Sequence, residues 1–266
     1  MANKTVCISA GHQPGFDPGA MSNGLVEADL TIKIADKVVE ILRKHSVPTL
    51  YVPNNISLFS TITWINDRNK QIDGCAVDIH INSAKGTGWE AYYYGDGNNS
   101  SEKLSQFMVD ALEAETSLPS RGVKSEYTTN RGKLGFVHDT VPVASLIECG
   151  FIDRDADRKL LSTEEGLFQI AKGVARGILG YIGVLWRPEL ITEKDPPPPV
   201  ESVSNPVETP PDPVESPDDP NPPSDPSPDV PDGGQHEKSP SLQSVLSLFT
   251  DFLHRLWEYI NFFIRK

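Results

Sequence analysis

The chain has 266 residues, of which 24 are lysine or arginine and 37 are aspartate or glutamate, and its formal net charge is −13 at pH 7. This length is enough for one or two ordinary domains. Since nucleic-acid binding needs a basic face, the acidic balance excludes nucleic acid as an expected partner.

Residues 1–186 alternate between strand and helix patterns. Short apolar runs predict strands at 5–9, 49–52, 75–81, 90–94 and 143–149. Longer segments, with apolar residues at steps of three and four, predict helices at 25–45, 60–71, 102–117 and 163–185. Such alternation predicts an α/β fold with a mostly parallel twisted sheet flanked by helices on both faces. We therefore assign residues 1–186 to one catalytic domain.

Residues 187–240 differ in composition from everything before them. Sixteen of the 23 prolines fall between Pro196 and Pro240, and the segment 195–234 contains ten acidic residues and no lysine or arginine. A chain of this kind cannot bury enough apolar surface to offset the entropy of ordering it. We predict a Pro-rich, acidic, disordered linker.

Residues 241–266 predict one amphipathic helix. Leucine, isoleucine and phenylalanine recur at alternating steps of four and three from Leu242 to Phe263. Charged residues at 251, 255 and 258 interrupt the run of roughly 18 uncharged residues that a membrane span needs. Three roles stay open: binding a membrane surface, binding a partner protein of a larger assembly, or pairing with a second copy as a coiled coil.

The three cysteines, Cys7, Cys75 and Cys149, stand in apolar contexts without zinc-ligand spacing. We expect buried free thiols, as in a protein made in a reducing cytosol. Cys149 follows Glu148 on a predicted strand, where adjacent side chains face opposite sides. Cys149 is therefore expected to point away from any site that Glu148 belongs to.

Glu148 is a single carboxylate inside the apolar run 143–152. A charged, dry and unpaired acid costs on the order of several kcal/mol, so its presence indicates a function. The candidate partners are His12, Glu27 and His80. His12 lies in a glycine-rich loop after the first predicted strand, Glu27 starts the first helix, and His80 ends the third strand. In an open α/β sheet, functional groups gather at the carboxyl ends of the strands.

Six motifs occur in order along residues 4–183. Residues 9–20 read S-A-G-H-Q-P-G-F-D-P-G-A, close to a D-P-G-H-G-G-x-D-P-G-A pattern whose leading Asp-Pro is replaced by Ser9 and Ala10. Glu27 then follows on a helix, and residues 78–84, D-I-H-I-N-S-A, are close to S-x-H-x-N-A. The other matches are G-x-E-x-Y at 88–92, R-G-V-K at 121–124 and I-E-C-G-F at 147–151. Together they resemble the zinc-dependent N-acetylmuramoyl-L-alanine amidases of type 3.

The resemblance implies a zinc site and a reaction. His12, Glu27 and His80 would bind one Zn²⁺, and Glu148 would be the catalytic acid/base. Two imidazoles and one carboxylate leave a fourth position open, as a catalytic zinc requires. The bond cut would be the amide between N-acetylmuramic acid and L-alanine of the stem peptide, which makes peptidoglycan the expected substrate.

Two other residues near these motifs, Glu90 and His138, have two interpretations each. Glu90 either faces water or lines the substrate groove, and His138 either contacts substrate or caps a turn. Asn82, in the His80 motif, is a third candidate for substrate contact. His45, beyond the first helix, is expected to be a solvated surface residue. The segment between His80 and Glu148 has no obvious blocking helix, so we expect a constitutively open site.

The resemblance also suggests a biological context. The N-terminus lacks the apolar region of a secretory signal, so we expect synthesis in the cytoplasm and access to the wall after release or delivery by another system. A phage-type or phage-like lysin fits these features. The rival hypotheses are another zinc amidohydrolase or peptidase acting on wall peptides, and an inactive wall-binding module anchored by its tail.

Overall fold

The structure, a computed structural model, describes residues 4–95, 97, 99–129 and 132–191. The predicted C-terminal helix and nearly all of the predicted linker lie outside the described residues, so the three-part division of the chain stays a prediction. The elements, in chain order, are β1 (Val6–Ala10), β2 (Met21–Ser22), β3 (Leu25–Val26), α1 (Glu27–Lys44), β4 (Thr49–Tyr51), α2 (Leu58–Asn66), β5 (Cys75–Asn82), β6 (Trp89–Tyr93), α3 (Asn99–Glu115), β7 (Ser120–Ser125), η1 (Glu126–Thr128), α4 (Gly135–Asp139), β8 (Ala144–Phe151), α5 (Asp155–Leu161), α6 (Glu164–Ile182) and η2 (Pro188–Leu190).

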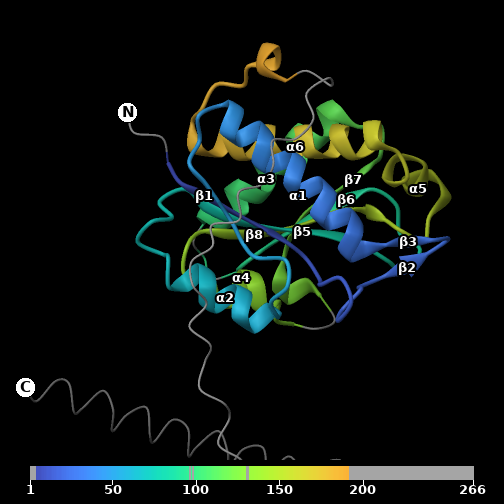
Figure 1. The fold of residues 1–266 in the computed structure, drawn as a ribbon, viewed down its shortest axis with the longest axis horizontal. Coiled ribbons are helices and arrows are strands. Elements are labelled where there is room, and N and C mark those ends of the chain that lie inside the picture. The colour runs from blue at the N-terminus through green and yellow to red at the C-terminus, as the bar shows by residue number, and fades with distance from the viewer. Residues whose placement is uncertain (1–3, 96, 98, 130–131, 192–266) are drawn as a thin grey trace, which may run out of the picture. The chain divides into compact units, whose positions relative to one another are not determined.

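Six strands form one sheet in the order β4-β1-β5-β8-β6-β7 (Figure 1). The pairs β4–β1, β1–β5, β5–β8 and β6–β7 are parallel, and only β6–β8 is antiparallel among them. β2 and β3 form a separate two-stranded ribbon beside the start of α1. The mostly parallel sheet of the predicted α/β fold is confirmed.

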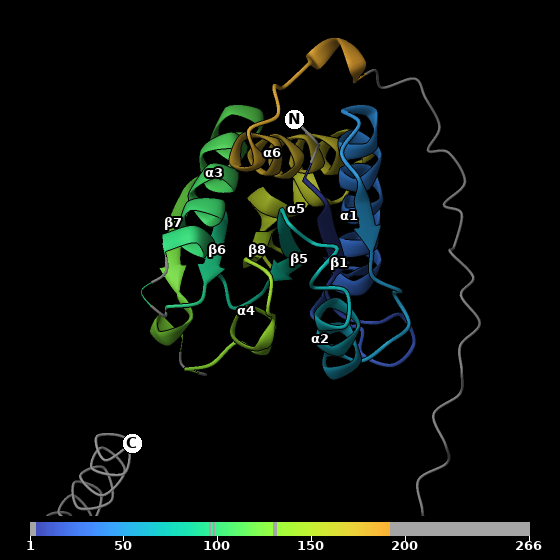
Figure 2. The same ribbon diagram turned by 90° about the vertical axis from the view of Figure 1, so that its left-hand side faces the viewer.

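The two faces of the sheet are covered unequally. Helices α1, α3 and α6 pack over one face, and the short helices α2 and α4 lie on the other, as Figures 1 and 2 show. The larger apolar core lies under the long helices, and a smaller core lies under α2 and α4. Strand alternation assigns each residue to a face: Val77 and Ile79 of β5 enter the large core, whereas Asp78 and His80 point to the other side.

Several element boundaries differ from the sequence predictions for local reasons. The first helix begins at Glu27 rather than at residue 25, because Leu25 and Val26 pair with β2. α2 begins at Leu58, where the Ser57 side chain accepts a hydrogen bond from Ser60 N. β7 was not predicted, because its sequence S-R-G-V-K-S lacks the apolar alternation of a half-buried strand.

The prediction that His45 is a solvated surface residue is wrong. Its side chain is buried and stacks on Trp186, with ring centroids 5.1 Å apart. Nδ1 donates to the Ile41 carbonyl, and Nε2 accepts from Arg187 N. His45 thus connects the end of α1 to the segment after α6, 142 residues away in sequence, a contact that no local pattern signals.

The predictions for the cysteines are confirmed. Cys7, Cys75 and Cys149 are buried free thiols. Cys149 enters the core beneath the long helices, on the opposite face from Glu148. Within the described ranges, no helix has the length and apolarity required to cross a membrane.

Candidate functional site

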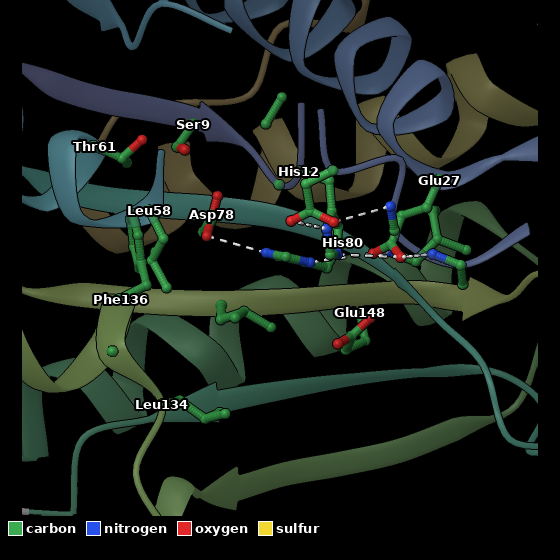
Figure 3. A pocket seen from close by; sticks show the side chains of 18 of the residues that line it. Ser9, His12, Glu27, Leu58, Thr61, Asp78, His80, Leu134, Phe136 and Glu148 are labelled. Atoms are coloured by element: carbon green, nitrogen blue, oxygen red, sulfur yellow. Dashed lines mark hydrogen bonds and ion pairs between the residues drawn. The ribbon is translucent and has the colours of Figure 1, made fainter. Parts of the chain in front are cut away.

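A cavity of about 990 Å³ lies on the sheet face that α2 and α4 share. Its floor comes from alternate residues of three neighbouring strands: Ser9 of β1, Asp78 and His80 of β5, and Leu146 and Glu148 of β8. Apolar side chains near α2 and α4 form its other end, where Figure 3 shows Leu58, Leu134 and Phe136 on the side away from Glu27.

His12, Glu27 and His80 meet at one end of the cavity. Their ligand atoms all lie within 4.8 Å of one another, close enough to hold one metal ion. Glu27 Oε2 lies 3.3 Å from His12 Nε2, and Glu27 Oε1 lies 3.2 Å from His80 Nδ1 (Figure 3). The three residues that the sequence groups together, from positions up to 68 residues apart, therefore form one cluster.

Backbone geometry holds the cluster in place. His12 lies just after β1 and has a left-handed backbone conformation, with φ 67°. This conformation turns the chain sharply at His12. Glu27 is buried at the first turn of α1, and its two oxygens accept hydrogen bonds from Ala20 N and Ile81 N. Glu27 thereby joins the loop after β1 to the carboxyl end of β5.

Two further carboxylates contact the outer nitrogens of the imidazoles. Asp17 Oδ2 lies 2.9 Å from His12 Nδ1, and Asp78 Oδ2 lies 3.1 Å from His80 Nε2. Each ring thus lies between Glu27 and one other acid. This arrangement is the usual support for a metal-binding histidine, whose second nitrogen is held by a carboxylate.

The electrostatics of the cluster favour positive charge. The hydrogen bond to Glu27 is the main cause that raises the pKa of His12. Burial lowers the pKa of His80, but Asp78 and Glu27 outweigh it and raise that pKa well above its usual value. Burial raises the pKa of Glu27, yet its contacts with both histidines bring that pKa far below the normal range. Three acids around two neutral imidazoles form an anionic group, and a divalent cation would offset most of its charge.

Glu148 lies beside this cluster, directly opposite His80 in the β5–β8 register. Its Oε2 atom is covered and has no hydrogen-bond partner among the residues that the structure describes. Burial raises the pKa of Glu148 to about 7, and the nearby His80 limits the rise. A carboxyl group with a pKa near neutrality can both accept and release a proton at physiological pH.

Comparison with known proteins places the chain in a family. The family model described as N-acetylmuramoyl-L-alanine amidase (Amidase_3) matches residues 6–180, more than half of the chain. The chain belongs to the N-acetylmuramoyl-L-alanine amidase family. The α/β fold and the amidase family predicted from the sequence are confirmed.

Individual relatives of this amidase family agree with the match. The sporulation-specific N-acetylmuramoyl-L-alanine amidase of Bacillus subtilis is 30% identical over 178 residues, 65% of this chain and 66% of that protein. The endolysin of Bacillus phage SPP1 is 31% identical over 180 residues, 66% of this chain and 65% of that protein. The chain thus spans about two thirds of the length of these two curated relatives.

A solved structure shows the same amidase fold. The N-acetylmuramoyl-L-alanine amidase of Clostridium difficile 630 superposes with a TM-score of 0.61 at 26% identity, covering 68% of this chain and 97% of that one. The part of the chain shared with these proteins is the domain that contains the cavity.

The three candidate substrate residues occupy different places in this amidase. Asn82 lines the cavity. Glu90 does not face water: it is 2% exposed and does not line the cavity. Glu90 instead accepts hydrogen bonds from Asn82 Nδ2 and from Tyr92 Oη, each 2.9 Å long, so it supports two residues that do line the cavity.

Two cations balance the buried charge of Glu90. Arg121 Nε donates to Glu90 Oε2 at 2.6 Å, and Lys124 Nζ donates to the same oxygen. Burial raises the pKa of Glu90, but these hydrogen bonds and that of Tyr92 outweigh it, and the pKa is lowered. The two cations come from β7, the strand that the sequence patterns missed, although its R-G-V-K motif was recognised.

His138 lies in α4 and is not among the residues that line the cavity. Its Nδ1 lies 2.8 Å from Oε1 of the fully buried Glu126, and its ring lies 4.7 Å from that of Tyr94. This placement favours the structural interpretation of His138, since the side chain anchors α4 to η1.

Sequence reasoning missed Asp17, Asp78 and Tyr92. Asp17 and Asp78 fall inside recognised motifs, so a signal for them existed, but only the fold shows which nitrogen each acid contacts. Tyr92 lies two residues after Glu90 on one strand face.

Gly11→Ala should displace His80 and weaken the affinity of the His12–Glu27–His80 cluster for a metal ion. A Cβ atom at Gly11 would lie 2.3 Å from Cε1 and 2.4 Å from Nε2 of His80, closer than such atoms can approach. Since a misplacement of about 1 Å can cost on the order of 100-fold in rate, we expect losses of that size in activity. Metal titration and a hydrolysis assay measure both effects.

Gly135→Ala is the matched control. Gly135 also lines the cavity, but its added Cβ would meet only Leu58 and Ile62 side chains at 3.4 and 3.7 Å. It should leave metal affinity unchanged. Equal metal affinity in Gly11→Ala and the unmodified protein would refute the steric argument.

Proposed function

We propose that this protein hydrolyses the amide between N-acetylmuramic acid and L-alanine of the peptidoglycan stem peptide, using a zinc ion held by His12, Glu27 and His80. The observation that carries the proposal is the position of Glu148 beside this cluster, in the same cavity. The family match supports the reaction, and the whole protein's substrate is inferred from it.

The donor set fits zinc. Two imidazole nitrogens and one carboxylate oxygen are the ligands of many catalytic zinc sites, which keep a fourth position for water or substrate. The outer carboxylates Asp17 and Asp78 fix the ring orientations from behind. When bound, zinc polarises a carbonyl oxygen and lowers the pKa of water towards neutrality.

Glu148 has the role of proton carrier in this proposal. Its carboxylate accepts the proton of the attacking water and then delivers it to the nitrogen of the leaving L-alanine amine. In the metal-free protein burial raises the pKa of this group to about 7, and a bound zinc ion would bring that pKa lower, towards the ordinary range of a glutamate. Asn82 and Tyr92 line the cavity and both donate hydrogen bonds to the buried Glu90, so they are polar residues held in place to orient the substrate.

Digestion of purified peptidoglycan tests the proposal directly. Mass spectrometry should find free stem peptides that begin with L-alanine, and EDTA should stop their release until zinc is added back. Products with cut cross-links and intact lactyl amides would instead identify a different zinc amidohydrolase or peptidase. Wall binding without any product would identify an inactive wall-binding module.

A lysin role is the biological context that we propose. Similarity to the endolysin of phage SPP1 supports it, although the sporulation-specific amidase matches comparably. The enzyme would be made in the cytoplasm and reach the wall through another system, and residues 241–266 would bind a membrane surface, a partner protein or a second copy. Sedimentation and binding to anionic vesicles separate these three roles of the tail.

A further inference from the structure

Asp78 and Ser9 are paired residues on the floor of the cavity. They face each other in the parallel register of β1 and β5, and both are buried, at 2% and 3% exposure. Both line the cavity. Their side chains therefore project side by side on the face that carries His80.

This pair is also where the chain departs from the two motifs that it otherwise matches. The D-P-G-H pattern has an acid at position 9, where the chain has serine, and the S-x-H pattern has serine at position 78, where the chain has an acid. The two departures exchange an acid and a hydroxyl between neighbouring strands. Positions 9 and 78 thus keep one carboxylate between them.

The contacts of Asp78 indicate what the carboxylate does. Oδ2 lies 3.1 Å from His80 Nε2, while the other ring nitrogen faces Glu27. Oδ1 is covered and has no hydrogen-bond partner in the described part of the chain. Figure 3 shows the His80 ring between Asp78 and Glu27. The ring is thus held from both sides, with Nδ1 left to face the metal cluster.

A carboxylate at position 9 could hold the ring in the same way. The His80 ring extends over the end of β1, where its atoms lie 2.3 to 2.6 Å from the place of a Cβ on Gly11. Residue 9 precedes Gly11 by two positions, on the same strand face. Position 9 is therefore next to Asp78 in the sheet, on the face that carries the His80 ring.

We propose that Asp78 is a positioning residue that fixes the orientation and tautomer of His80 for metal binding, and that it replaces an acid on β1 through a compensated exchange with Ser9. A carboxylate behind a metal-binding imidazole orients the ring and increases its basicity, and its loss costs about 10- to 100-fold in metal affinity. The inference rests on the proposed role of His80 as a ligand.

Zinc affinity of the full-length chain, measured by competition with a chromogenic chelator, tests the inference apart from catalysis. Asp78→Ser should weaken binding about 10- to 100-fold, and Asp78→Asn, which keeps a neutral hydrogen-bond acceptor, should lose less. The double variant Ser9→Asp/Asp78→Ser should recover most of the affinity.

The outcomes separate this inference from the proposed function. An unmodified protein that binds no zinc would overturn both. Zinc affinity within twofold of the unmodified protein in Asp78→Asn and Asp78→Ser would overturn the positioning role alone. A double variant no tighter than Asp78→Ser would overturn the exchange. Thermal unfolding of each metal-free variant identifies any that fails to fold, in which case Asp78→Asn carries the comparison.

Discussion

Glu148→Gln should abolish hydrolysis and, at neutral pH, stabilise the metal-free protein. General acid–base catalysis contributes about 10²- to 10⁴-fold, so the rate should fall by at least that range while zinc stays bound. Glutamine has nearly the shape of glutamate but carries no proton that it can exchange.

The gain in stability follows from the raised pKa of Glu148. In the unfolded chain a glutamate titrates near 4.3, whereas burial raises the pKa of folded Glu148 to about 7. A carboxyl group whose pKa is raised in the folded protein makes its full contribution to the free energy of unfolding below its unfolded pKa. That contribution is lost as the pH rises from the unfolded pKa through the folded pKa. The protein therefore loses stability between about pH 4.3 and 7, and the loss amounts to roughly 1–3 kcal/mol in the free energy of unfolding at neutral pH.

The activity should change with pH in the opposite sense to the stability, rising as the pH rises. Only ionised Glu148 accepts a proton, so kcat/KM should fall as pH falls below about 7, and bound metal would move this midpoint to lower pH by stabilising the carboxylate. A kcat/KM profile flat from pH 5 to 8 would contradict the assignment of Glu148 as the base.

Asp157→Asn is the control for the stability measurement. Asp157 is also a buried acid, but its oxygens accept hydrogen bonds from Thr87 Oγ1, Gly88 N and Phe151 N. The same acid-to-amide change should destabilise the protein there, because an amide nitrogen cannot accept these bonds. Urea titrations of both variants at pH 5 and 7.5 should give shifts of opposite sign at the higher pH.

Glu27→Ala should remove both metal binding and part of the fold's stability. Glu27 contacts both histidines, and removing a direct ligand should weaken zinc binding by more than about 100-fold, the upper range for a supporting residue. The variant also leaves Ala20 N and Ile81 N without their acceptor. Unpaired buried groups cost about 1–3 kcal/mol each, so we expect the two together to lower the free energy of unfolding of the metal-free protein by roughly 2–6 kcal/mol.

Asp29→Ala provides the comparison, since Asp29 stands in the same first turn of α1 and is exposed. It should change the free energy of unfolding by about 0.5 kcal/mol or less and leave zinc affinity intact. Isothermal titration with zinc and denaturant unfolding measure the two effects. A Glu27→Ala protein as stable as Asp29→Ala would show that the two backbone hydrogen bonds contribute little.

Short motifs at strand ends predicted the cluster, because the parallel connection of strands brings their carboxyl ends together. His12 and His80 could therefore be grouped from their positions at strand ends, whereas Glu27, at the start of the first helix, was joined to them by its distance from His12 in the sequence and by the family resemblance. Strand periodicity also predicted that Cys149 and Glu148 face opposite sides, as they do.

What the sequence did not predict depends on partners distant in the chain. His45 is buried only because residues 186–187 return to α1 after α6. β7 is held in the sheet by β6 and by the ion pairs of its Arg121 and Lys124 with Glu90, not by apolar alternation. The acids that support the imidazoles were hidden for the same reason, since a motif gives spacing along the chain and not the direction of a ring nitrogen.

His80 and Glu148 are paired across neighbouring strands, whereas other parts of the cavity wall come from helices and loops. The spacing of these two side chains therefore does not depend on the parts of the chain that shape the cavity for its substrate. The distance between the two side chains follows from the spacing of adjacent strands, about 4.8 Å, which backbone hydrogen bonds keep constant. Much of the rest of the cavity wall comes from α2, α4 and connecting loops. Insertions there can reshape what enters the cavity while His80 and Glu148, the proposed metal ligand and the proposed proton carrier, keep their separation.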